Sequence, residues 1–478
     1  MKLTLNYIEF IEFTEEFNCK FVPYISQLYV SYKHNLDYFT KFYESKSLVH
    51  LVLSNSPLDI SNFLDSLSQL DQCPILDTLE SLEFNVLSQH DSQQVDFCKV
   101  AKAFKESSKI HTIKVQGLIH FSVIENASML LKFTGLKEIL LCNVNNVVYV
   151  VQSIFSDHRS PIEKLSIEYN FIPEETEITT ILSELVKSNN LTDLNINMAK
   201  VSVGELVGFL NEAKSLKSIS GSFLMLEQDI LLPTIHSKSL EHMNIDMNYN
   251  SNNEEFDIHN LWTNSRIVST TLSKLDNPHQ FQFLETIRYS LKNHDLTYIC
   301  NIIKFNMKSL KNFTILNPRR LKFTNFDPLY ESLSHNSHLE SFHHNLFVPH
   351  KILKRFILSN HKSIKATSLM CLKPYSLAKF SSIIHNNSKI TKLEIILIGE
   401  VENVTPSLCT ILRLNHIEQI TFRLDFNHIN PIESGMDQLI EVIKENISHL
   451  YHLEFITFGE LTLTKYCKDN FFNLNKIK

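Results

Sequence analysis

A short spacing of apolar residues, apolar-x-x-apolar-x-apolar, recurs along almost the whole chain. Its last two apolar positions are two residues apart, as on one face of a β-strand, and the first lies where the chain turns into the strand. Between the first clear copy and the last, 405 residues contain 14 intervals of about 29 residues each. The copies begin at Leu48, Leu79, Ile110, Leu136, Ile162, Leu191, Leu216, Leu240, Leu284, Leu310, Leu339, Ile364, Ile390, Ile417 and Leu453, with an earlier candidate at Ile25.

Between these expected strands the apolar positions change to a helical spacing. Residues 60–67, 178–185 and 203–210 each place apolar side chains at i, i+3, i+4 and i+7. Several such stretches end at asparagines, for example Asn336 and Asn387, and asparagine tolerates the left-handed conformation that ends many helices. Strand and helix therefore alternate at a fixed period, which predicts a repeat protein.

The repeat resembles the ribonuclease-inhibitor-like class of leucine-rich repeats. Residues 162–172 match the family pattern LxxLxLxxNxL throughout, whereas Ser56, Val144 and Ala199 replace the family's Asn or Cys in other copies. The resemblance covers about residues 20–465. It implies an α/β fold, a leucine-rich-repeat solenoid or horseshoe with a parallel β-sheet on the concave side and helices on the convex side.

We divide the chain into an N-terminal cap at 1–20, an array of about 16 repeats at 21–463, and a C-terminal cap or tail at 464–478. A loop insertion is expected near 247–262, because the interval from Leu240 to Leu284 is 44 residues long and contains a polar stretch. The only tryptophan, Trp262, follows that stretch, and we expect it to pack back onto the helix side.

A globular α/β enzyme is the competing architecture. Such folds place glycine-rich turns after their strands, but this chain has eight glycines and neither a P-loop nor a Rossmann fingerprint. Histidines gather between His335 and His361, but they fall on an expected helix end, strand and loop, with no metal-ligand spacing. Cys142 is expected to be a buried turn residue. We therefore expect no enzymatic activity, no metal and no cofactor.

Charge and cysteine usage narrow the class of partner. The net charge of −7 gives no broad basic field for nucleic acid or anionic lipid. The eight cysteines lie far apart without a CxxC pair, which is typical of reduced thiols, so we expect a cytoplasmic or nuclear protein. No run of eighteen apolar residues suggests a membrane span.

The third and fifth places of each copy should face solvent on the concave side. These residues are small, polar and mixed in sign, which favours a protein partner bound through distributed contacts. The sequence thus predicts a non-enzymatic interaction scaffold of unknown partner and oligomeric state. The residues we expect to contact the partner are Lys164, Asp193, His242, Arg288 and Lys392.

Three alternatives remain at this point, of which regulation of a small GTPase by the solenoid has no discriminating residue in the sequence. The chain could be the substrate-recognition subunit of a ubiquitin ligase with a degenerate F-box-like N-terminus, although Leu3, Leu5 and Tyr7 alternate like a strand. The segment 248–262 could instead be the recognition element, as insertions in solenoids sometimes are.

Overall fold

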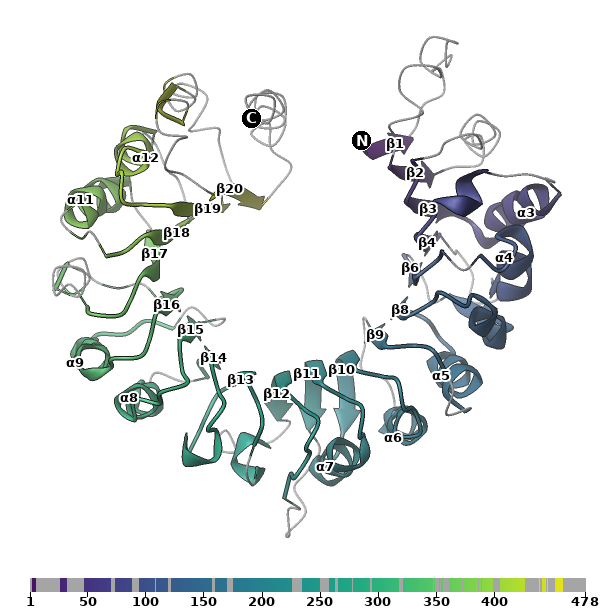
Figure 1. Ribbon diagram of the computed structural model, residues 1–478, viewed down its shortest axis with the longest axis horizontal. Coiled ribbons are helices and arrows are strands. Elements are labelled where there is room, and N and C mark those ends of the chain that lie inside the picture. The colour runs from purple at the N-terminus through teal and green to yellow at the C-terminus, as the bar shows by residue number, and fades with distance from the viewer. Residues whose placement is uncertain are drawn as a thin grey trace. The chain divides into compact units, whose positions relative to one another are not determined.

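The computed structural model divides the chain into two compact units: Met1–Glu254 with Leu261–Arg266, and Glu255–Asn260 with Ile267–Lys478. In each unit, parallel strands lie on the inner side of a curved stack and helices lie on its outer side (Figure 1). The structure describes residues 2–5, 26–31, 47–69, 74–87, 94–107, 109–118, 122–156, 160–169, 175–225, 234–249, 258–262, 265–276, 278–292, 295–317, 321–346, 348, 352, 354–355, 361–371, 374–385, 387, 389–398, 405–425, 438, 441–443, 445 and 452–458.

The first unit contains ten parallel strands in one continuous ladder within the described residues, each paired with the next in chain order. The segment in which Leu3 and Leu5 alternate with polar residues forms the first strand of this ladder. Two short strands, β5 (Gln94–Asp96) and β7 (Val123–Glu125), pair separately. The ladder comprises β1 (Lys2–Leu5), β2 (Gln27–Ser31), β3 (His50–Asn55), β4 (Ser81–Val86), β6 (Thr112–Gly117), β8 (Glu138–Cys142), β9 (Lys164–Glu168), β10 (Asp193–Val201), β11 (Ser218–Met225) and β12 (His242–Tyr249).

Helices follow the strands of this unit, and side chains cap the first turn of several of them. Ser56, which stands where the repeat family has asparagine, instead caps its helix by accepting a hydrogen bond from the backbone N–H of Asp59. Ser202 and Glu205 form a reciprocal capping box. The outer elements are α3 (Pro57–Ser68), η4 (Pro74–Asp77), α4 (Phe97–Ala103), η5 (Ala127–Lys132), α5 (Val147–Phe155), α6 (Glu175–Leu185) and α7 (Val203–Glu212).

The second unit repeats the arrangement, with consecutive parallel pairing from β13 to β20. Its strands are β13 (Ser269–Leu272), β14 (Thr286–Ser290), β15 (Asn312–Leu316), β16 (Ser341–His344), β17 (Ala366–Cys371), β18 (Lys392–Ile398), β19 (Gln419–Asp425) and β20 (His452–Phe458). Its outer elements are η6 (Ile258–Leu261), η7 (Pro278–Gln280), α8 (Thr297–Lys304), α9 (Asp327–His335), α11 (Pro374–Ile384) and α12 (Thr405–Leu412).

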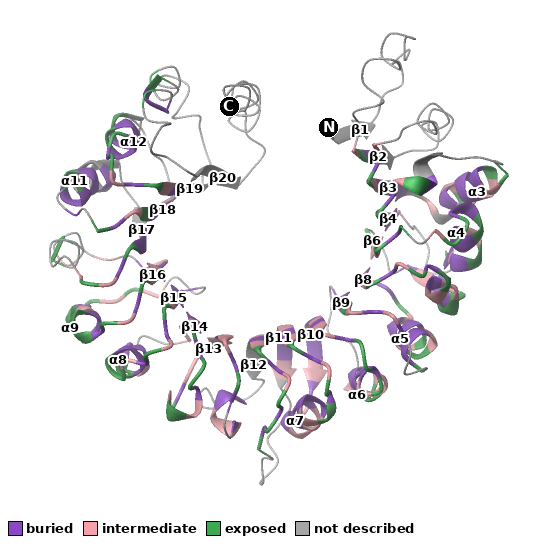
Figure 2. Cartoon of the chain, viewed as in Figure 1, coloured by how far each residue is buried: buried purple, intermediate pink, exposed green. Residues whose placement is uncertain are grey.

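The core lies between the sheet and the outer elements, as Figure 2 shows by the buried residues that line both. The first, fourth and sixth residues of the repeat fill it. Leu165, for example, is paired in register with Ile139 on one side and Leu194 on the other, and all three are at most 2% exposed. Each such side chain contributes about 1.5–3 kcal/mol through burial, so the stacked rows stabilise neighbouring repeats together.

One repeat does not show the apolar spacing. The interval from Leu240 to Leu284 contains β13, whose fourth repeat position is Thr270 instead of an apolar residue. Thr270 is buried, and its hydroxyl lies 2.5 Å from Nε2 of the buried His259. A polar pair therefore replaces the usual apolar residue.

Trp262 is 1% exposed and bridges to Ile235 of its own unit, which confirms that it is packed rather than presented to a partner.

The sequence pattern assigns the last repeat to the wrong register. The sequence pattern takes Leu453 as its first position, but Leu453 pairs with Ile420, a fourth-position residue, and Phe455 pairs with Phe422. The copy therefore begins at Leu450, three residues earlier. The two registers share the apolar residue Leu453, so spacing alone did not separate them.

Asn336 and Asn387, at helix ends, act by a different mechanism from the one expected, although Asn306 after α8 does have a positive φ of 53°. Asn336 has φ −83° and ψ 132°, an extended and not a left-handed conformation. Its Oδ1 accepts hydrogen bonds from the backbone N–H groups of His338 and Leu339, at 3.0 and 2.9 Å, and its Nδ2 donates to Ile303 O. Asn387 makes the same kind of turn. The side-chain amide thus connects the helix end to the next strand.

The presence of glycine at position 221, the sixth place of its repeat, has a steric explanation. β10 contains an irregularity after Ile196, where Met198 has a positive φ of 65°. Gly221 has φ +134°, and a Cβ built there would collide with the backbone of Ile196. The apparent defect in the pattern is therefore required by the neighbouring strand.

Candidate functional site

We use the term inner face for the side of each sheet that carries the third and fifth repeat positions, away from the helices. In the second unit this face is hollowed over β16 and β17, where three of the four inner-face residues, Ser341, Ala366 and Ser368, are small. Ser341 and Ala366 occupy neighbouring third positions. At the fifth position, Ser368 turns its hydroxyl into the sheet, where it accepts from His344 N and donates to His344 O. Register pairing between the two strands covers only two residue pairs.

An ion pair crosses this hollow. Nδ1 of His343, on β16, lies 3.2 Å from a carboxylate oxygen of Glu394, on β18. The strand between them, β17, places Ser368 beside Glu394 in register, and this short side chain leaves the path open. His343 and Glu394 are 27% and 19% exposed, so the pair is partly shielded from solvent and attracts most strongly when the imidazole is protonated.

The hollow is an open groove of about 620 Å³. We call it the inner-face groove. It runs across five consecutive strands, from β15 to β19, and polar side chains supply most of its wall. Its lining residues are Asn312, Glu340, Ser341, His343, Lys365, Ala366, Thr391, Lys392, Leu393, Glu394, Glu418, Gln419 and Thr421.

Two of the sequence-predicted contact residues belong to this region. Lys392 lines the groove directly. Arg288, on β14, is paired in register with Thr314, which in turn is paired with His343. Both cations are exposed, and neither forms an ion pair or hydrogen bond with any part of the described chain. They stand on strands four apart, so they do not touch each other: Lys392 lies within the groove, and Arg288 lies on the strand next to its β15 edge.

The other three predicted residues lie on the first unit. Lys164 and Asp193 are direct register neighbours, and Ser218 separates Asp193 from His242 in the same row. Asp193 accepts a hydrogen bond of 2.6 Å from the Thr192 hydroxyl. The topology thus brings these three into one row, and none of them is among the residues that line the inner-face groove.

The histidine-rich segment separates into different roles. His344 is buried in the core at a sixth position, where burial and then the neighbouring His343 lower its pKa to about 4, although a backbone hydrogen bond at Leu346 opposes the shift. His361 replaces the helix-end asparagine: Nε2 lies 2.6 Å from Leu333 O, while Nδ1 accepts from Ser363 N and Ile364 N. Across the described part of the chain, no three His, Cys, Asp or Glu residues are grouped to hold a metal ion.

Cys142 is buried, as expected, at the end of β8. Burial, followed by the charge of Glu168, raises the pKa of its thiol to about 12, and Sγ lies 3.5 Å from that carboxylate. A thiol with such a pKa stays protonated near neutrality and is a poor nucleophile.

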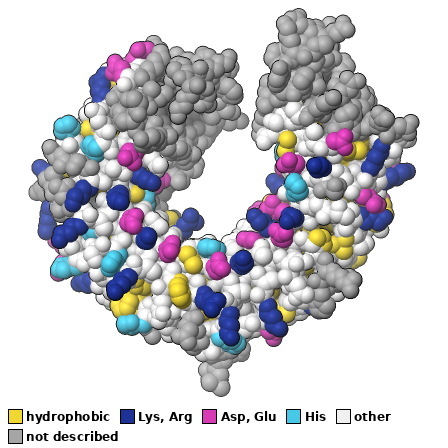
Figure 3. Space-filling model, viewed as in Figure 1, with side chains coloured by type: hydrophobic (Ala, Val, Ile, Leu, Met, Phe, Trp, Pro, Cys, Tyr) yellow, Lys and Arg dark blue, Asp and Glu magenta, His cyan; other side chains and the backbone are white. Residues whose placement is uncertain are grey.

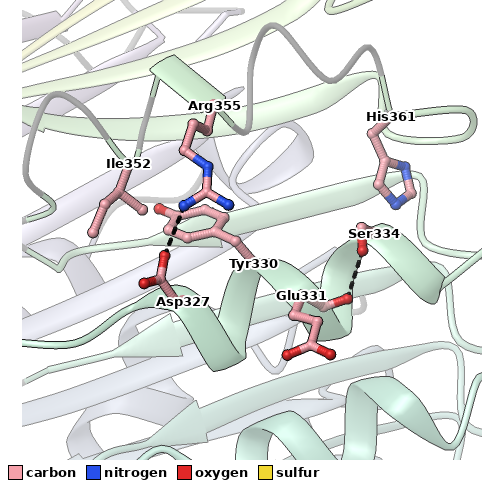
Figure 4. A pocket seen from close by; sticks show the side chains of 7 residues that line it. All are labelled: Asp327, Tyr330, Glu331, Ser334, Ile352, Arg355 and His361. Atoms are coloured by element: carbon pink, nitrogen blue, oxygen red, sulfur yellow. Dashed lines mark hydrogen bonds and ion pairs between the residues drawn. The ribbon is translucent and has the colours of Figure 1, made fainter.

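A second hollow, of about 360 Å³, lies on the outer side against α9 (Figure 4). Arg355 points toward Asp327 there, with Nη1 3.0 Å from the carboxylate, but the two side chains are 76% and 64% exposed. Ion pairs that are so exposed contribute little to the stability of a protein. His361, at the other end, already serves the turn described above, so this hollow is the weaker candidate.

Charges of both signs are scattered over the face shown in Figure 3, without a broad field of one sign. Along the chain that the structure describes, no helix has the length and apolar character needed to span a membrane.

The repeated core positions, the parallel sheets and the outer helices define both units as leucine-rich-repeat solenoids. No known protein family matches the chain, and no curated protein matches it either. Among solved structures, a crystal structure of a TLR13–ssRNA13 complex is similar at 11% sequence identity and a TM-score of 0.28, over 90% of this chain and 80% of that one. The assignment to this fold therefore rests on register and burial within the chain itself.

Proposed function

We propose that the protein is a non-enzymatic scaffold that binds an extended segment of a partner protein across the inner face of its solenoid, with the inner-face groove as the main contact. The observation that carries this proposal is the groove over β15–β19. Its side chains stand on a hydrogen-bonded parallel sheet, so they are held in place before a partner arrives and binding orders few of them.

The proposed contact surface includes all five residues that the sequence pattern selected. Arg288 and Lys392 would act at the groove, and Lys164, Asp193 and His242 would extend the contact on the first unit. We also propose that the repeats are of the ribonuclease-inhibitor-like kind, since 7–12-residue α-helices follow many of the strands. A cytoplasmic or nuclear location is part of the same proposal, supported by the free thiols of Cys98, Cys142, Cys300 and Cys409.

The ubiquitin-ligase alternative assigns the N-terminal segment to a helical F-box-like module, whereas Lys2–Leu5 of that segment forms a strand of the sheet. Residues 6–25, which would carry the rest of such a module, lie outside the described residues. The recognition-loop alternative loses its exposed aromatic, because Trp262 is buried.

A steric block tests the proposal. Ser341→Tyr places a large ring over the groove floor, and Ser334→Tyr places the same ring on the exposed outer surface of α9 as a matched control. Partners isolated with the wild-type protein from its native cells should bind the Ser334→Tyr variant normally and the Ser341→Tyr variant at least tenfold more weakly, with both variants melting within a few degrees of wild type. Loss of binding only in the outer variant would refute the inner-face site, and loss only on deletion of residues 250–255 would favour the loop.

A further inference from the structure

The charges around the groove restrict which partner segment fits it. The third and fifth positions of β13–β18 are the inner-face residues of six consecutive strands. Within this described set, three side chains besides His343 are charged: Arg288, Lys392 and Glu394. Glu394 is already engaged by His343 at 3.2 Å. Arg288 and Lys392 are therefore the charged side chains of this set that have no ion-pair partner in the described chain, and both are cations, while Glu394 keeps its negative charge as long as His343 is neutral.

Arg288 stands in a field of hydroxyl and amide groups. Its register neighbours are Thr271 and Thr314, and Thr286 precedes it on the same face of its own strand. Asn312, next to Thr286, donates to the Thr286 hydroxyl at 3.2 Å. No inner-face carboxylate occurs on β13, β14, β15 or β16 at the third and fifth positions, as the described residues show. A guanidinium in such surroundings can accept a carboxylate in the bidentate geometry it prefers.

A separate row of charges follows the second repeat position, at the edge where the strands begin. It alternates in sign, with Glu285, Lys311, Glu340 and Lys365 on successive strands, and Lys311 lies 3.8 Å from Glu340. Alternating charges largely offset one another, so this part of the row adds little net field near Arg288; the row continues with the uncharged Thr391 and with Glu418, which also lines the groove.

The positions of the two unpaired cations also set a spacing. Four consecutive strand pairings separate β14 from β18. At ~4.8 Å per pairing, the strands are roughly 19 Å apart, and an extended peptide advances ~3.3 Å per residue. Carboxylates that reach Arg288 and Lys392 together would therefore be about six residues apart.

We infer that the partner segment is an extended acidic peptide with two carboxylates about six residues apart, one bound by Arg288 and the other by Lys392. This inference rests on the proposed function and adds the chemistry of the ligand. Each of the two binding positions on the peptide would meet a single cation. A single cation balances the charge of a carboxylate better than that of a doubly charged phosphate, which usually binds more than one cation.

A displayed library of random twelve-residue peptides, selected on the full-length protein, tests the inference. Enriched peptides should carry two Asp or Glu residues five to seven positions apart. As fluorescent synthetic peptides they should bind Arg288→Glu and Lys392→Glu about tenfold more weakly than wild type. Lys308→Glu, at an exposed lysine between α8 and β15 that belongs to no proposed contact, serves as the matched control and should leave binding unchanged. Binding should also weaken as salt is raised.

The outcomes separate the inference from the proposed function. If the selection enriches no peptides, or peptides without the paired carboxylates, the inference is wrong. Peptides without that pair that still require an open groove, and so fail to bind Ser341→Tyr, would leave the proposed function standing. Peptides that bind Ser341→Tyr as well as wild type would contradict both. Tighter binding of the same sequence with phosphoserine at the acidic positions would assign the site to phosphate and overturn the carboxylate assignment.

Discussion

The buried imidazole of His344 should make the second unit sensitive to acid. The unfolded chain binds a proton at this side chain near its ordinary pKa of 6.5, whereas burial lowers the pKa in the folded state to about 4. Between these two values the unfolded state binds more protons than the folded state, so stability falls as the pH decreases. Above pH 6.5 the full stability is present, and below pH 4 no further loss comes from this group.

The shift from 6.5 to about 4 fixes the size of the effect. At 1.36 kcal/mol per pKa unit, the free energy of unfolding should fall by about 3 kcal/mol over this window because of His344 alone. His344→Leu places at this sixth position a side chain of the kind that neighbouring repeats use there. It should remove that loss while keeping the backbone bonds to Ser368, which do not involve the imidazole.

Denaturant unfolding of the wild type and of His344→Leu at pH 7.5 and 4.5 measures the effect. Groups common to both proteins cancel in the comparison of their pH dependences. His361 also has a pKa lowered by burial, so His361→Asn, which restores the residue type of Asn336 at the same place in the turn, is the second variant. His335→Gln, on the exposed end of α9, is the control. Parallel loss of stability in the wild type and His344→Leu would refute the reasoning.

Three further changes test the repeat geometry. Leu165→Asp should destabilise the first unit by about 3–5 kcal/mol, because it buries a carboxylate between two strands. Ser166→Asp, on the inner face, should change the melting temperature little. Equal melting temperatures of the two variants would mean that the register is wrong. Gly221→Ala should lower the stability by about 2 kcal/mol or more, because of its positive φ. Gly208→Ala, with open space around it in α7, should raise the stability by up to about 1 kcal/mol. The opposite order in thermal unfolding would contradict the steric argument. Deleting residues 1–20 removes β1 and uncovers the edge of β2, so aggregation or fraying is expected in light scattering and amide exchange; a soluble, equally stable truncation would show that the segment is not a cap.

The strands could be predicted from the sequence because core positions demand apolar residues at fixed spacing. That reasoning failed where a polar pair fills the core, at Thr270 and His259, and where two registers share one apolar residue, at Leu453. At Asn336 the residue was correctly placed at the helix end but given the wrong mechanism, because side-chain hydrogen bonds cannot be deduced from a preference for left-handed backbone.

The candidate site could be predicted only in part. The third and fifth positions selected Arg288 and Lys392, since a strand's alternation decides which side chains face away from the core. The groove between them depends on Ser368 turning into the sheet and on Glu394 reaching across β17, and neither orientation follows from spacing. The signal available in the sequence was the small size of three inner-face residues of β16 and β17, Ser341, Ala366 and Ser368.

The short pairing between β16 and β17 affects how the second unit unfolds. In a repeat protein, cooperativity is passed from each repeat only to its neighbours. Here the sheet pairing consists of two register pairs and the hydrogen bonds of the Ser368 hydroxyl, whereas β18 and β19 share seven register pairs. Among the described strand pairs of this unit, β16 and β17 share the fewest register pairs, so we expect the amide protons of β13–β16 and β17–β20 to exchange as two separate cooperative blocks. A ligand that spans the groove would join the two blocks, so its binding energy would appear as protection from exchange on both sides of the junction.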